Sequence, residues 1–180
     1  MSESFYIKML SKNLMICIFI LNSLSLAFAQ DKYDSVPEDS LSFGGINTSS
    51  TLDETLKIFG SPIVNKTYIY EDGDGPDGFE EQYYLTYENM NLTFLKYRGK
   101  AKFSSCIVKT RLIPVKIERN IIQVGDTAER IKELYPHSYS ESTKANEESI
   151  FIYLEDTDGF IKILLENDLI VSIEIDLDPA

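Results

Sequence analysis

The chain has 180 residues and a formal net charge of −12 at pH 7, from 17 basic and 29 acidic residues. Nucleic acids and anionic membranes bind clustered Lys and Arg, so this charge excludes both as ordinary partners. The single histidine and the absence of Gly-x-Ser-x-Gly, Cys-x-x-Cys and phosphate-loop motifs argue against the common enzyme classes. We therefore predict that the protein is not an enzyme and uses no cofactor.

Residues 1–29 have the order of a secretory signal peptide. Two lysines precede an apolar run at 14–21, and Ala27-Phe-Ala29 stands directly before Gln30. The run is shorter than the ~20 apolar residues that a membrane-spanning helix needs. We predict cleavage near Ala29-Gln30, a secreted or periplasmic location, and no transmembrane segment in the mature protein.

The mature chain of about 150 residues is long enough for one domain with a sizeable core. Residues 30–42 are polar and without periodicity, which predicts a flexible leader. Cys106 is the one cysteine after the signal peptide, so packing and not a disulfide must stabilise the fold. We expect Cys106 to be buried on a strand.

The first half of the fold is predicted at 43–120. Thr51 and Glu54 have the spacing of a capping box, which begins a helix over about 51–59, and Gly60-Ser-Pro62 ends it. Runs rich in aromatic and β-branched residues then predict four strands, at 63–70, 81–87, 91–97 and 102–112.

The second half, at 121–180, repeats this order. Asp126 or Thr127 caps a helix over about 127–135, and Pro136 ends it before a short strand near 138–140. Further strands are expected at 150–155, 160–165 and 169–177. In the last of these, alternation predicts one buried row, formed by Leu169, Val171, Ile173, Ile175 and Leu177.

A helix followed by an antiparallel meander, twice, predicts an α+β fold of two tandem repeats. This pattern resembles the repeat of the β-lactamase inhibitory protein, a unit also found in small outer-membrane lipoproteins of the SmpA/OmlA type. The matching residues are Thr51, Glu54, Phe59, Gly60 and Pro62, then Thr127, Ile131, Leu134 and Tyr135. Pro136 stands where that pattern has glycine, and no cysteine matches the lipoproteins' lipidated one.

The resemblance implies two sheets joined side by side, with the helices on one face and the other face open to a protein partner. Tyrosines are frequent on the strands of the first half, and Tyr84 and Tyr87 must point to opposite faces. Such tyrosines form either a partner-binding surface or ordinary cross-strand packing, and the nearby charges either steer a partner or are simply solvated. The candidate binding residues are Tyr68, Tyr70, Tyr84, Tyr97, Lys109, Arg111, Glu174 and Asp176.

The acidic loop 71–78, Glu-Asp-Gly-Asp-Gly-Pro-Asp-Gly, is the alternative functional site. Asp72, Asp74 and Asp77 offer carboxylates to Ca²⁺, although the spacing does not match an EF-hand. Asp and Gly are also the ordinary residues of a mobile hairpin connection, and the corresponding segment of the second half, 141–148, lacks this alternation.

Three functions remain open. The leading prediction is a non-catalytic module that binds an envelope or extracellular protein. The alternatives are a calcium-stabilised extracellular domain and, with less weight, an envelope hydrolase that uses a pair of carboxylates. His137 is expected to be a solvated residue in a turn that follows the second helix.

Overall fold

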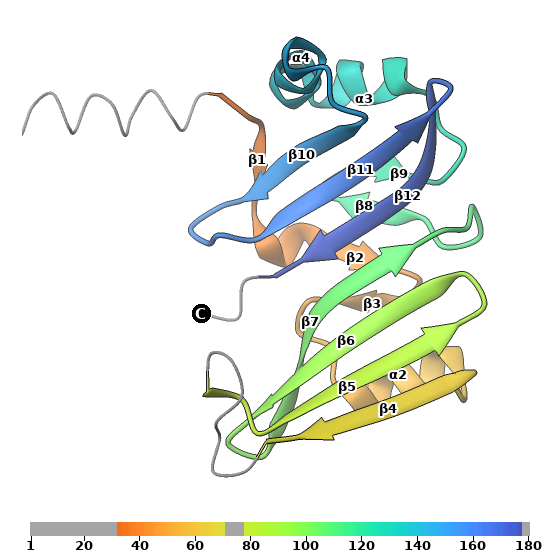
Figure 1. The fold of residues 1–180 in the computed structure, drawn as a ribbon, viewed down its shortest axis with the longest axis vertical. Helices are drawn as coiled ribbons and strands as arrows, with labels where there is room; N and C mark the ends of the chain where they lie inside the picture. The colour runs from red at the N-terminus through yellow and green to blue at the C-terminus, as the bar shows by residue number, and fades with distance from the viewer. Residues whose placement is uncertain (1–31, 71–77, 178–180) are drawn as a thin grey trace, which may run out of the picture. The chain divides into compact units, whose positions relative to one another are not determined.

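The computed structural model describes residues 32–70 and 78–177, and the compact unit treated below begins at Asp34 (Figure 1). The predicted signal peptide at 1–29 and the candidate calcium ligands Asp72, Asp74 and Asp77 lie outside the described residues. The described part of the chain is α+β, with one mixed sheet, one smaller antiparallel sheet and short helices.

The large sheet has eight strands in the order β1-β10-β11-β12-β7-β6-β5-β4. Neighbouring strands are antiparallel, except that β1 runs parallel to β10. The two meanders that the sequence predicts lie in this one sheet, because β7 pairs with β12. The bounds are β1 Ser35–Val36, β4 Val64–Ile69, β5 Glu81–Tyr87, β6 Met90–Tyr97, β7 Lys100–Val108, β10 Ser149–Leu154, β11 Phe160–Glu166 and β12 Leu169–Asp176.

A smaller four-stranded sheet, in the order β3-β2-β8-β9, was not predicted from the sequence. Its strands have two or three residues each, too few for alternation to be recognised. The sheet packs on the large one, where the rings of Phe43 and Phe103 lie 5.3 Å apart. The bounds are β2 Leu41–Phe43, β3 Ile46–Asn47, β8 Val115–Ile117 and β9 Asn120–Ile122.

The helices of the described residues are α2 Leu52–Phe59, α3 Ala128–Leu134 and α4 Pro136–Ala145, and η1 at Glu38–Ser40 is a short 3₁₀ turn. The predicted capping box of α2 is confirmed, because Thr51 accepts from the Glu54 N–H and Glu54 accepts from the Thr51 N–H. The positive φ of Gly60, +74°, lets the chain leave α2 at the predicted residue. Thr127 caps α3, also as predicted.

The core lies between the two sheets and the helices. One row of paired residues crosses it on the inner face of the large sheet: Leu85, Leu92, Cys106 and Ile175, each at most 1% exposed. The predicted burial of Cys106 is therefore confirmed. Loss of solvent around its sulfur raises the pKa of this thiol, so it stays protonated and acts as a packing residue.

The prediction of a loose leader through residue 42 is wrong from Ser35 onward. β1 pairs with β10, and Val36 and Leu41 are 2% and 1% exposed. These apolar residues are isolated within a polar segment, so the sequence shows no period there. Their burial depends on strands that lie far along the chain.

The second helix is not followed by an exit turn and a strand near 138–140, as the sequence predicted. Pro136 instead occupies the first position of α4. Its fixed φ suits a helix there, and the N–H that proline lacks would have no acceptor within the helix at this position. His137 is an exposed residue in the first turn of this helix, and residues 141–145 are helical rather than part of a loop.

Two predicted strand patterns also differ from the structure. β7 ends at Val108 instead of residue 112, and Leu112 is 88% exposed. In β12 the pairing steps from Leu164↔Ser172 to Leu165↔Ile170, which leaves Val171 as an extra residue. Ile170 is consequently buried, whereas Leu169, predicted in the buried row, is 44% exposed.

Candidate functional site

The two faces of the large sheet have different surroundings. Figure 1 shows α2 and the small sheet behind it, on the inner face. We call the opposite side the open face. Side chains alternate along each strand, so its central row is given by the strand pairing: Lys66, Tyr84, Thr93, Ser105 and Asp176.

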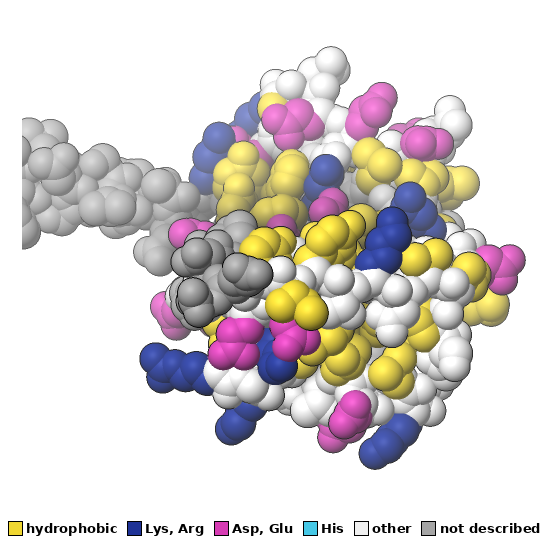
Figure 2. All heavy atoms as spheres, turned by 60° about the horizontal axis from the view of Figure 1, so that its bottom comes forward, with side chains coloured by type: hydrophobic (Ala, Val, Ile, Leu, Met, Phe, Trp, Pro, Cys, Tyr) yellow, Lys and Arg dark blue, Asp and Glu magenta, His cyan; other side chains and the backbone are white. Residues whose placement is uncertain are grey.

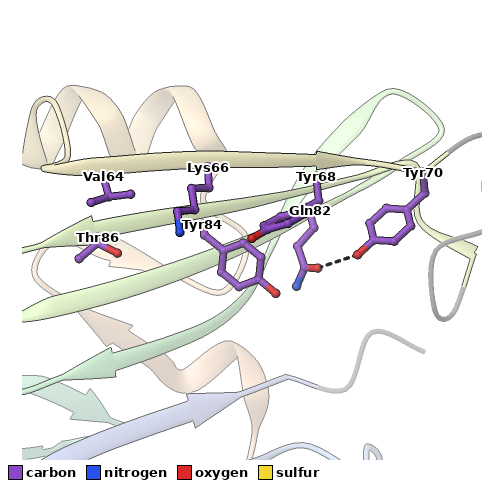
Figure 3. A pocket seen from close by; sticks show the side chains of 7 residues that line it. All are labelled: Val64, Lys66, Tyr68, Tyr70, Gln82, Tyr84 and Thr86. Carbon is purple, nitrogen blue, oxygen red and sulfur yellow. Dashed lines mark hydrogen bonds between the residues drawn. The ribbon is translucent and has the colours of Figure 1, made fainter.

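A hollow of about 380 Å³ lies on the open face over β4 and β5. We call it the tyrosine hollow, and its side chains come from alternate residues of the two strands (Figure 3). The rings of Tyr68 and Tyr84 meet edge to face, with centroids 5.5 Å apart. The lining residues are Val64, Lys66, Tyr68, Tyr70, Gln82, Tyr84 and Thr86.

The polar groups of the hollow are only partly engaged with each other. The Tyr70 hydroxyl donates to Gln82 Oε1 at 3.4 Å, a long hydrogen bond. Partial burial, together with Tyr70 and Tyr68, raises the pKa of the Tyr84 hydroxyl, so this group stays neutral over the physiological range. It can therefore donate and accept hydrogen bonds at a binding surface.

A second aromatic cluster adjoins the hollow. The ring of Phe79 lies 5.0 Å from that of Tyr70 and 6.1 Å from that of Tyr97, both edge to face. Phe79 itself is 3% exposed. Tyr70 and Tyr97 thus act partly as packing residues, which leaves Tyr68 and Tyr84, 48% and 38% exposed, as the accessible pair.

The predicted charges do not gather as expected. Glu174 and Asp176 point to the open face, where Glu174 lies 3.8 Å from Lys162 of the neighbouring strand. Lys109 and Arg111 instead follow the end of β7. The guanidinium of Arg111 lies 2.9 and 3.3 Å from the side-chain amide of Gln123, next to the small sheet.

The second half adds apolar side chains to the open face. The rings of Phe151 and Phe160 are 5.6 Å apart, and Tyr153 is 39% exposed. Figure 2 shows hydrophobic side chains gathered across this part of the surface, with charged groups among them. Lys66, Gln82 and Phe79 were not predicted as site residues from the sequence. Counting by twos from Tyr68 and Tyr84 would have found the first two, because alternate strand residues share a face.

The carboxylate with the clearest partners, that of Glu81, lies on the inner face of β5, opposite the hollow, and has the wrong character for acid catalysis. Hydrogen bonds from Lys96 and then from the Tyr83 hydroxyl lower the pKa of Glu81. A general acid needs a raised pKa. This cluster therefore holds neighbouring strands together rather than carrying out proton transfer.

Within residues 32–70 and 78–177, no group of three or more His, Cys, Asp or Glu side chains is arranged to hold a metal ion. No helix in that part of the chain is long and apolar enough to cross a membrane. No protein-family model matches the sequence, and no curated protein and no solved structure matches it either. The resemblance to the β-lactamase inhibitory protein therefore stays a prediction.

Proposed function

We propose that this protein is a non-catalytic binding module that meets an envelope or extracellular protein with its open face. The observation that carries the proposal is the exposed, mutually packed pair Tyr68 and Tyr84 in a hollow of the sheet. Tyrosine combines a large apolar ring with a polar tip and few rotatable bonds, so it binds with little loss of conformational entropy.

The arrangement of the hollow supports binding rather than simple packing. Its floor consists of backbone in two regularly paired strands, and the edge-to-face contact holds the rings before a partner arrives. Lys66 and Gln82 place a cation and an amide beside the rings. A partner that offers an apolar side chain next to a carboxylate or carbonyl would complement this set.

Tandem duplication accounts best for the order of the elements. Each half has a hairpin in the small sheet, a Thr-capped helix and a meander in the large sheet. The capping residues bridge to corresponding meander strands, Thr51 to Lys102 and Thr127 to Leu169. The halves meet at β2·β8 and β7·β12. This order favours a boundary between β7 and β8, earlier than residue 120.

The proposed location outside the cytoplasm rests on the signal-peptide pattern of residues 1–29. It is tested by the N-terminal sequence of the exported protein, which is expected to begin at Gln30. An N-terminus at Met1 in the cytoplasmic fraction would contradict it.

Capture of partners from envelope or extracellular extract tests the binding surface. We expect Tyr84→Ala to reduce the amount of a specifically captured protein about tenfold, as loss of a central aromatic anchor does. The matched control is Ile58→Ala, since Ile58 is 49% exposed on α2, away from the open face. Equal capture by the wild type and Tyr84→Ala, or equal loss in both variants, would contradict the proposal.

A further inference from the structure

The strand β4 is a free edge of the large sheet. Among the described residues no strand pairs with its outer side, and all six of its residues are exposed. It contains neither Pro nor Gly, and its register with β5 is continuous. Ile69 is 75% exposed and Tyr68 is 48% exposed. A regular, partly apolar edge of this kind is a template for another strand.

The backbone of β4 presents its free groups at known residues. The Tyr70 N–H donates to the Glu80 carbonyl at 2.9 Å, so this backbone group points toward β5. Backbone groups alternate between the two sides of a strand in an antiparallel ladder, and therefore Lys66 and Tyr68 also bond toward β5, opposite Tyr84 and Gln82. The N–H and C=O groups of Asn65, Thr67 and Ile69 point away from the sheet.

We propose that β4 pairs antiparallel with β4 of a second copy of the chain, with the two-fold axis at Thr67. This register makes roughly six backbone hydrogen bonds between the outward groups of the two strands. On the open face it sets Lys66 opposite Tyr68 of the other copy, where the ammonium can lie against the ring. Val64 is set opposite Tyr70. On the other face Asn65 is opposite Ile69.

Charge selects this register among the near alternatives. An axis at Lys66 would place two ammonium groups directly opposite each other, which is unfavourable. An axis at Asn65 would leave Tyr68 and Tyr70 without a paired strand residue of the second copy. The axis at Thr67 uses the whole strand and separates the two cations.

The pairing extends one sheet through both copies and keeps the open faces on the same side, because a two-fold axis of this kind is perpendicular to the sheet. The two tyrosine hollows then adjoin across the axis. A partner with two matching sites would bind with avidity. This inference does not depend on the proposed function, since the dimer can form whether or not the hollow binds another protein.

The properties of the dimer follow from its size and charge. Two six-residue strands bury less surface than a standard interface, so the dimer is expected to dissociate on dilution through the micromolar range. Each chain carries a net charge of −12, and salt screens the repulsion between the copies. Association should therefore be tighter at about 0.5 M salt than at about 0.05 M.

Sedimentation of the full chain, expressed with its natural N-terminal segment and taken as the cell processes it, tests the proposal. We expect concentration-dependent dimers for the wild type and for Thr67→Val, which keeps the outward N–H. Thr67→Pro removes that N–H without touching the bonds to β5, and we expect a monomer. A wild type that stays monomeric into the hundreds of micromolar, or Thr67→Pro that still dimerises, would overturn the proposal.

Hydrogen exchange of the wild type keeps the proposal testable if Thr67→Pro fails to fold. Protection of the Asn65, Thr67 and Ile69 amides should rise with protein concentration, while that of Lys66 and Tyr68 stays unchanged. Concentration-independent exchange at all five amides would overturn the proposal. Tyr84→Ala should leave the dimer intact, which separates this test from the partner-capture experiment.

Cysteine cross-linking tests the register. Lys66→Cys and Tyr68→Cys proteins should form a disulfide with each other when mixed, because the axis at Thr67 places these residues opposite each other. Neither variant should cross-link efficiently with itself. Self-cross-linking of Lys66→Cys that exceeds cross-linking in the mixture would contradict the Thr67 axis.

Discussion

The two edge strands of the large sheet, β1 and β4, differ in length and exposure. At one edge β1 has two residues, is followed directly by Pro37 and buries Val36 to 2% exposure. At the other, β4 runs for six residues that are all exposed. Short length, a following proline and a buried side chain are the usual means of closing a sheet edge. Of these two edge strands, β4 is therefore the one that remains available for pairing.

Contacts from α4 complete the closed edge. Asp34 Oδ2 accepts from the Ser138 N–H at 2.8 Å, and the Asp34 N–H donates to Ser138 Oγ at 2.9 Å. The residue before α4, Tyr135, makes no side-chain cap, so Asp34 supplies the cap from a distant part of the chain. Asp34 thus fastens the first turn of α4 with its carboxylate and β10 with its backbone carbonyl, which accepts from the Tyr153 N–H.

Replacing a valine by aspartate on each edge strand should give the largest difference in the free energy of unfolding. We expect Val36→Asp to lower the free energy of unfolding by about 3 to 5 kcal/mol, because it buries an unpaired carboxylate. Val64 is 37% exposed, so Val64→Asp should cost less than about 1 kcal/mol. Urea unfolding measures both. Similar losses for the two variants would show that the edges do not differ as described.

Asp34→Ala should loosen only the closed edge. We expect a loss of about 1.5 to 3 kcal/mol, the usual value of a hydrogen bond to a charged group. Exchange of the Tyr153 amide, which donates to the Asp34 carbonyl at 3.0 Å, should become about tenfold faster. The Leu154 amide bonds to Gly159 on the other side of the strand and is the control. Equal acceleration at both amides would indicate general destabilisation instead.

The cluster of Glu81, Lys96 and Tyr83, next to the edge strand β4, should affect the stability of the protein at acid pH. Lys96 and Tyr83 lower the pKa of Glu81 from its usual value of 4.5, so its contribution to stability is complete above that pH and is lost as the pH falls through the lower folded-state value. The wild-type melting temperature should therefore drop more between about pH 5 and about pH 3 than that of Glu81→Gln. The difference is expected to be small, and a steeper drop in Glu81→Gln would contradict this role.

Calcium should have the smallest effect. Loop 71–78 stands between β4 and β5 in the sequence, and we predict that millimolar Ca²⁺ after EGTA leaves the melting temperature unchanged. A ligand of the native state must raise stability. An increase that Asp74→Asn abolishes would therefore restore the calcium-stabilised domain as the better function.

Local signals predicted individual elements well where neighbouring residues decide the structure. The capping box of Thr51 and Glu54 set the beginning of α2, and alternation set β5 at its observed bounds. The opposite faces of Tyr84 and Tyr87 are also confirmed, since Tyr87 packs against Phe59 of α2 with ring centroids 5.7 Å apart. Each of these outcomes depends on contacts within a few residues or on the two-residue repeat of a strand.

Prediction failed where distant contacts decide. Pro136 ends a helix by most sequence rules, yet it begins α4, whose first turn is capped by Asp34. The extra residue Val171 in β12 shifts the buried row by an amount that alternation alone does not show. Arg111 follows a strand that stops early and contacts Gln123 instead of the open face. In each case the decisive partner lies on another element of the fold.

The sequence by itself determined the α+β class, the starts of α2 and α3 and the period of the strands, because capping and side-chain alternation are local. Tertiary structure alone decided that β7 meets β12, that β1 closes one edge and that Tyr68 and Tyr84 share a hollow. Pairing between strands far apart in sequence depends on burying a common core, and no single segment carries that information.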